Sequence, residues 1–126
     1  MNLNHLGIAT KNLQNANKFI RNTHNVINSI GPIWDQNLNA NLQLLEIENS
    51  ISIELVEGAI VSSLLKKGIN LYHFCYEVDD IKSTISKYIN NGGLLLLEPT
   101  PAILFQDRLV CFINTPVGII ELLSKT

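Results

Sequence analysis

The sequence carries little positive charge and few cysteines. Its 126 residues hold 9 lysines and arginines against 11 acidic residues, which gives a formal net charge of −2 at pH 7. Arg21 and Arg108 are the only arginines, so the chain lacks the clustered basic side chains with which proteins bind nucleic acid. Cys75 and Cys111 are too few for a disulfide framework, and we expect both to be thiols in a reducing cytoplasm.

Long hydrophobic runs are also missing. The longest purely aliphatic run is Leu94–Leu97, far below the roughly 20 apolar residues that a membrane-spanning helix needs. A basic segment followed by an apolar one is absent near the N-terminus, so we expect neither a membrane span nor a signal peptide. Hydrophobic residues nevertheless make up 46% of the chain and charged residues 16%, a composition typical of a folded domain. We expect one cytoplasmic domain over residues 1–126.

The chain contains an internal repeat. The segment Leu3–Ile8 recurs as Leu71–Tyr76, and Ser52–Val56 recurs as Ile119–Leu123, at offsets of 68 and 67 residues. Self-similarity at a fixed long period indicates repeated structural units. We interpret the sequence as two copies of one module, with module one at about 1–58, a connector at about 59–69 and module two at about 70–126.

Each copy has the same predicted order of elements. A short strand around a histidine precedes a helix with a period near 3.6, and three further strands follow, which predicts an α+β fold of two β-α-β-β-β modules. Asn12 and Asp80 are suitable N-caps, and Asn91–Gly93 is suited to end the second helix. The predicted strands after the helices cover 30–34, 42–47, 51–56, 94–98, 109–113 and 118–123. The predicted apolar stripes of the helices are Leu13, Ala16, Phe19, Ile20 and Thr23, and Ile81, Ile85, Tyr88 and Ile89.

One histidine lies on the first strand of each copy and one glutamate on the last. His5 and Glu54 are 49 residues apart, and His73 and Glu121 are 48 apart. Strand alternation places a small residue, Gly7 or Cys75, after each histidine on its own face. If the sheets enclose one cleft, two imidazoles and two carboxylates meet there. Two nitrogen and two oxygen ligands suit one catalytic divalent ion such as Zn, Ni, Co, Mn or Fe.

These features resemble the vicinal oxygen chelate superfamily, which includes glyoxalases, bleomycin resistance proteins and dioxygenases. The segment Leu71–Ile81 looks like the second-module segment of methylmalonyl-CoA epimerases, and Asn114–Leu122 is similar to the superfamily's closing strand. The resemblance implies a curved mixed sheet around a metal-binding cleft, with His5, Glu54, His73 and Glu121 as the metal ligands.

The implied activity is that of a metal-dependent isomerase or epimerase that acts through an enolate next to a carbonyl. The best guess for the substrate is a methylmalonyl-CoA-like thioester. Epimerases of this group commonly carry Gln where this chain has Glu54, whereas the bacterial glyoxalase I pattern has Glu. A lactoylglutathione lyase of the glyoxalase I type, acting on a glutathione adduct, therefore stays an alternative. A second alternative is a non-catalytic small-molecule binding or resistance protein.

Carboxylates next to the ion can move a proton by general acid–base catalysis. Glu121 is the first choice for this role and Glu54 the second, and Glu46 is a third carboxylate whose facing the sequence leaves open. Candidate substrate-binding residues are Gly7, Cys75 and Arg108, although Cys75 can equally be a small core residue and Arg108 can pair with a nearby acid. The resemblance also implies a homodimer.

Overall fold

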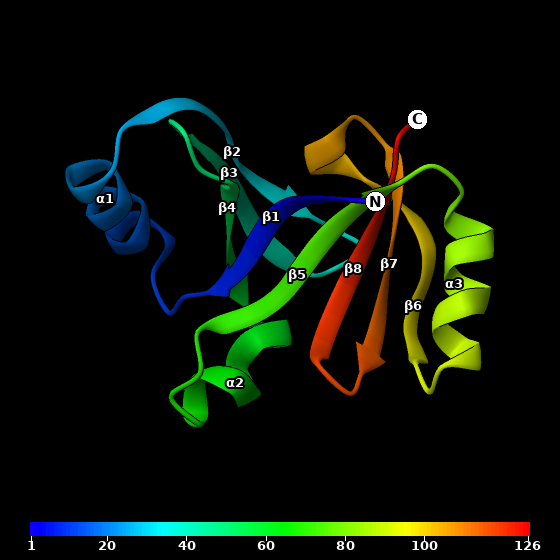
Figure 1. The fold of residues 1–126 in the computed structure, drawn as a ribbon. Helices are drawn as coiled ribbons and strands as arrows, with labels where there is room; N and C mark the ends of the chain where they lie inside the picture. Colours follow the sequence, from blue (N-terminus) through cyan, green and yellow to red (C-terminus); the bar gives the residue numbers. More distant parts are fainter. The chain divides into compact units, whose positions relative to one another are not determined.

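The computed structural model describes residues 1–126, which form eight strands, three α-helices and two short 3-10 helices. Figure 1 shows their arrangement along the chain. The chain divides into two compact units. The N-terminal unit is His5–Tyr72, and the C-terminal unit is His73–Thr126 together with Met1–Asn4. None of the helices has the length and apolar character needed to cross a membrane.

The N-terminal unit contains strands that pair in the order β2-β3-β4-β1. Strand β1 pairs with β4 in parallel, while β2–β3 and β3–β4 are antiparallel, so the sheet is mixed. Helix α1 packs on β4, and its Leu13 joins Leu45 and Leu55 in a buried cluster. The elements are β1 (Asn2–Ala9), α1 (Leu13–Thr23), β2 (Val26–Asp35), β3 (Ala40–Ile47) and β4 (Ser52–Gly58).

The C-terminal unit repeats this arrangement with the order β5-β8-β7-β6. Strand β5 is parallel to β8, and the other two pairs are antiparallel. The α+β fold of two β-α-β-β-β modules is therefore confirmed. The elements are β5 (Leu71–Val78), α3 (Ile81–Asn90), β6 (Leu94–Ala102), β7 (Arg108–Thr115) and β8 (Gly118–Ser124).

Both long helices begin at the predicted caps. The Asn12 side chain accepts a hydrogen bond from the Asn15 amide at 3.0 Å, and Asp80 accepts one from the Ser83 amide at 3.2 Å. These bonds satisfy first-turn amides that have no partner within the helix. Helix α3 ends before Gly92, whose φ of 94° is the left-handed conformation that favours glycine.

The predicted apolar stripes are wrong at their flanks. Phe19 is 64% exposed and Ile89 is 45% exposed, and Thr23 is exposed as well. At 3.6 residues per turn, Phe19 lies about 120° around the helix from Leu13, and Ile89 about 80° from Ile81. Only the residues nearest the centre of each stripe reach the sheet.

Several strands are longer than the sequence predicts. Strand β2 runs from Val26 through Pro32 to Asp35, and β6 continues through Pro99 and Pro101 to Ala102. Each is the last strand of its unit's sheet, where a proline without an N–H can be accommodated, and each has register shifts along its length. The predicted connector also contains two helical segments, η1 (Ala59–Val61) and α2 (Ser62–Lys66).

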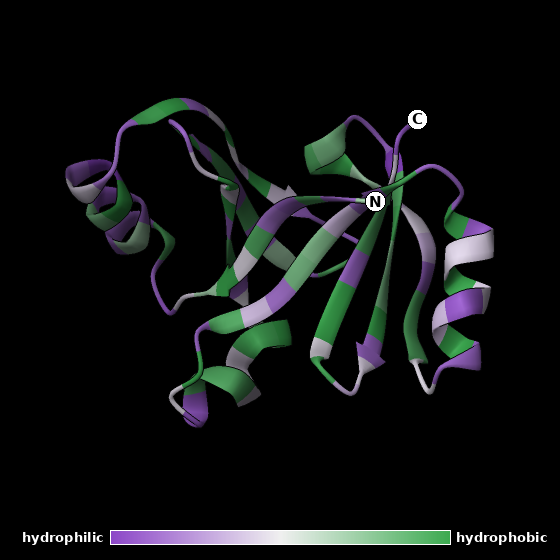
Figure 2. Cartoon of the chain, in the orientation of Figure 1, coloured by the Kyte–Doolittle hydropathy of each residue, from purple (hydrophilic) through white to green (hydrophobic).

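The sheet of the C-terminal unit has two distinct faces. One face packs against α3 through Cys111, Ile113, Ile120 and Leu122, in a cluster that includes Ile81. Figure 2 shows apolar residues along most of β7 and β8. Because side chains alternate along a strand, Phe112 and Glu121 must lie on the opposite face. This opposite face carries the candidate functional residues.

Candidate metal centre

A buried histidine–glutamate pair lies in the N-terminal unit. His5 on β1 is fully buried, Glu54 on β4 is 4% exposed, and the distance from His5 Nε2 to Glu54 Oε1 is 3.7 Å. The pair forms because β1 and β4 are parallel neighbours, with Gly7 as the register partner of Glu54. The predicted proximity of His5 and Glu54 is thus observed within this unit.

The C-terminal unit holds a second pair at the matching positions. His73 on β5 and Glu121 on β8 are each 2% exposed, and His73 Nε2 lies 3.1 Å from Glu121 Oε1. The Phe112 ring meets the His73 ring edge-on, with centroids 5.2 Å apart and planes at 79°. The imidazole therefore contacts both a carboxylate and an aromatic ring, and the sequence alone did not reveal the contact with Phe112.

Small residues stand beside both glutamates. Gly7 is the register partner of Glu54, and Cys75 is the register partner of Glu121. Each small residue follows its histidine by two positions and therefore shares the histidine's face. We infer that Gly7 and Cys75 leave the space in which the glutamate reaches the imidazole. Their predicted substrate-binding role stays a prediction.

This geometry makes the size of residue 75 decisive. Replacement of Cys75 by alanine should keep the affinity for a divalent ion within about threefold. Replacement by leucine should weaken it by about 10–100-fold, the range seen when the support of a metal ligand is disturbed. Titration of metal-free protein with Co²⁺, followed by absorbance, measures both affinities. Equal affinities for the two variants would show that the space beside Glu121 is not needed.

The other predicted residues occupy distinct places. Arg108 begins β7, and its Nη2 lies 2.6 Å from Glu77 Oε2 while its Nε donates to the Ser124 carbonyl at 2.7 Å. Its predicted substrate role stays a prediction. Glu46 is half-buried on β3, two residues after Leu44, which is the register partner of Glu54. Alternation therefore places Glu46 on the same face of the N-terminal sheet as Glu54, which settles the facing that the sequence left open.

Cys111 lies outside the polar face. It packs in the cluster under α3, and burial raises the pKa of its thiol to about 11. Its position in this cluster, on the face of the sheet opposite Phe112 and Glu121, separates Cys111 from the candidate metal ligands.

The donor chemistry fits a divalent ion. A carboxylate buried without a cation is costly, and both glutamates are at least 96% buried beside a histidine. Two ligands that each lie 2.0–2.2 Å from one ion are about 3–3.5 Å apart. The 3.1 Å and 3.7 Å separations of the two pairs are close to this range. Nitrogen and oxygen donors in equal number suit a catalytic first-row ion.

Comparison with known proteins identifies the family. The Glyoxalase/Bleomycin resistance protein/Dioxygenase superfamily matches residues 4–112. No curated protein sequence matches the chain at a significant level.

Solved structures show the same fold. A hypothetical protein from Bacillus halodurans is 22% identical with a TM-score of 0.76, covering 98% of this chain and 94% of its own. Methylmalonyl-CoA epimerase from Mycobacterium tuberculosis is 20% identical with a TM-score of 0.77, covering 99% and 88%. A variant of the Streptomyces coelicolor methylmalonyl-CoA epimerase, in complex with 2-nitronate-propionyl-CoA, is 19% identical with a TM-score of 0.77, covering 98% and 96%. With its repeated modules and the family match over most of its length, the chain belongs to the glyoxalase/bleomycin resistance protein/dioxygenase superfamily, the vicinal oxygen chelate superfamily.

Proposed function

We propose that this protein is a metal-dependent epimerase that moves a proton on a carbon next to a carbonyl. We propose further that the two histidine–glutamate pairs together bind one divalent ion (Zn, Ni, Co, Mn or Fe). The observation that carries the proposal is the occurrence of a buried pair at matching positions of both units. Each of the four residues offers one ligand atom, and all four are buried.

The residues of the chain have separate tasks in this reaction. His5 and His73 serve as neutral nitrogen donors. When bound, the ion acts as a Lewis acid that withdraws electron density from the carbonyl oxygen, which acidifies the adjacent C–H bond. Glu121 then accepts the proton as general base, and the electron pair of the C–H bond moves toward the carbonyl.

A second carboxylate completes an inversion. The proton must return to the opposite side of the carbon, and Glu54 is the candidate donor, which requires that it carry a proton before this step. Glu46 is a further candidate because it shares the face of Glu54. After the product leaves, Glu121 releases its proton to solvent and Glu54 takes one up, which restores the starting state. No atom is gained or lost in this sequence, so the proposed reaction needs no oxidant or second substrate.

The substrate we propose is a methylmalonyl-CoA-like thioester. Support comes from the epimerases of the same fold, one of which was solved in complex with methylmalonyl-CoA and NH4⁺. The second candidate is a glyoxalase I-type lyase. Glu54 favours it, because the resembling glyoxalase pattern has Glu at this position.

Bound metal is the first test. Elemental mass spectrometry on tag-free protein is expected to find about one divalent ion per chain. The change His73→Ala should abolish this binding, because it removes one of the four donors. The change His24→Ala is the matched control, since His24 is exposed at the end of α1 and should leave the metal content unchanged.

The result also separates the functional classes. If neither purified protein nor protein reconstituted with Co, Ni, Mn and Zn holds an ion, the enolate mechanism is wrong and a binding protein is the better account. With metal present, deuterium exchange into methylmalonyl-CoA supports the epimerase. Turnover of a glutathione adduct without such exchange supports the lyase.

A further inference from the structure

The two units differ at one pair of matching positions on the candidate functional face. Glu77 follows His73 by four residues, and Ala9 follows His5 by four. Arg108 precedes Phe112 by four residues, and Ala40 precedes Leu44 by four; Phe112 and Leu44 are the register partners of Glu121 and Glu54. A charged pair in the C-terminal unit thus replaces a pair of fully buried alanines in the N-terminal unit.

The Glu77–Arg108 ion pair is not needed to form the fold. The N-terminal unit forms the same β-α-β-β-β arrangement with Ala9 and Ala40, so the architecture does not require an ion pair at these positions. The metal-ligand positions, in contrast, carry the same residue types in both units. Because the fold does not need the Glu77–Arg108 pair, we look for a role of this pair in the function of the C-terminal unit.

Glu77 and Arg108 lie on the same face as the His73–Glu121 pair. Alternation along β5 puts Glu77 on the face of His73 and Cys75, and alternation along β7 puts Arg108 on the face of Phe112. Cys75 is the register partner of Glu121, so Glu77 is about 7 Å farther along this face at about 3.3 Å per residue.

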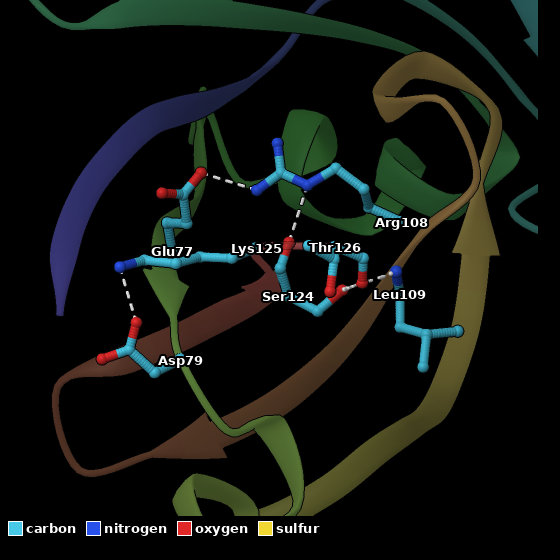
Figure 3. A network of polar contacts seen from close by, with 7 residues as sticks. All are labelled: Glu77, Asp79, Arg108, Leu109, Ser124, Lys125 and Thr126. Carbon is cyan, nitrogen blue, oxygen red and sulfur yellow. Dashed lines mark hydrogen bonds and ion pairs between the residues drawn. The ribbon is translucent and has the colours of Figure 1, made fainter.

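The Arg108 guanidinium makes two polar contacts, one to Glu77 and one to Ser124 (Figure 3). The Arg108 and Glu77 side chains are 24% and 25% exposed, so a solute can reach them. The Ser124 carbonyl holds Nε and Glu77 holds Nη2 of Arg108. A guanidinium has five N–H donors in a fork that matches a carboxylate, and these two contacts engage only part of it.

We infer that Arg108 is the specificity residue that binds an anionic group of the substrate, and that Glu77 occupies the guanidinium when substrate is absent. The hydrogen bond from Arg108 Nε to the Ser124 carbonyl keeps the guanidinium oriented while the substrate carboxylate takes the place of Glu77. The inference rests on the proposed function and specifies its substrate class. The substrate class is therefore a carbonyl compound that also carries a carboxylate.

Two thioesters that differ only in this carboxylate test the inference. Isothermal titration calorimetry with methylmalonyl-CoA and propionyl-CoA measures binding to wild-type protein and to Arg108→Gln. We expect wild-type protein to prefer methylmalonyl-CoA by about 10-fold or more, the size of a charge-assisted interaction. Arg108→Gln should lose most of this preference, with its affinity for propionyl-CoA unchanged.

The chain offers a matched control for charge. Lys125 pairs with exposed Asp79 at 2.5 Å near the same strand ends, and this contact lowers the pKa of the Asp79 carboxyl. Lys125→Gln removes the same charge but neither of the hydrogen bonds of Arg108, and it should keep the wild-type preference. Glu77→Gln removes the competing carboxylate and should tighten methylmalonyl-CoA binding severalfold.

Equal binding of the two thioesters by wild-type protein, or an unchanged preference in Arg108→Gln, overturns the inference. So does loss of the preference in Lys125→Gln, because that result would reflect general attraction between charges. Metal content measured on the same samples distinguishes this failure from failure of the proposed function. A metal-free protein that still prefers methylmalonyl-CoA contradicts the epimerase mechanism while supporting the role of Arg108.

Discussion

Replacement of Glu121 by glutamine is expected to slow deuterium exchange at the α-carbon of methylmalonyl-CoA by about 10²–10⁴-fold, the usual contribution of a general base. The amide has nearly the same shape and keeps an oxygen that can act as a ligand, but it cannot accept the proton. Because Glu121 is 2% exposed and lies 3.1 Å from His73, water has little room to substitute for it. Proton NMR in D₂O follows the exchange directly.

The matching change in the other unit sharpens this experiment. Glu54→Gln should retain more exchange activity than Glu121→Gln if Glu121 is the base that removes the proton. Glu98→Gln is a suitable control, since Glu98 is exposed on β6 and belongs to neither histidine–glutamate pair. Exchange in Glu121→Gln within tenfold of wild type, at equal metal content, would mean that another residue is the base.

Removal of the divalent ion is expected to lower the thermal unfolding midpoint of the protein substantially. An ion that binds only the folded chain stabilises it by about 2.7 kcal/mol at a free concentration of 100 times Kd. Its loss also leaves two carboxylates, 4% and 2% exposed, without the compensating charge. Calorimetry before and after chelation, followed by return of the ion, measures the shift.

Two variants test whether the thermal shift comes from an ion bound by His5 and His73. A His5→Ala, His73→Ala double variant should unfold at the same temperature with and without chelator, because it lacks both nitrogen donors. His24→Ala should show the full wild-type shift. A chelator-induced loss of stability that persists in the double variant would place the stabilising ion elsewhere on the chain.

The internal repeat is the reason that the four candidate metal ligands could be predicted from the sequence. His5, Glu54, His73 and Glu121 could be singled out because the same two residue types recur at nearly the same separation, and strand alternation then predicts that each pair shares a face. The observed register partners Gly7 and Cys75 supply a physical reason for the small residues that the sequence shows after each histidine.

Other features depend on information that local patterns lack. The exposure of Phe19 and Ile89 depends on how wide a part of each helix surface contacts the sheet, and the apolar pattern of the helix alone does not give this width. The helical segment at Ser62–Lys66 has no capping side chain to signal it. The Arg108–Glu77 contact joins residues 31 apart in sequence, and it becomes apparent only when β5 and β7 are both placed beside β8.

The prolines of the outer strands limit how copies of the chain can associate. Pro32 interrupts β2, and Pro99 and Pro101 interrupt β6, so neither strand offers a continuous row of amide donors to a neighbouring chain. Strand addition, the route by which exposed sheet edges aggregate, is thereby disfavoured at both places. We therefore expect a homodimer of this protein to form through side chains on a helix or a sheet face rather than by extension of a sheet past β2 or β6.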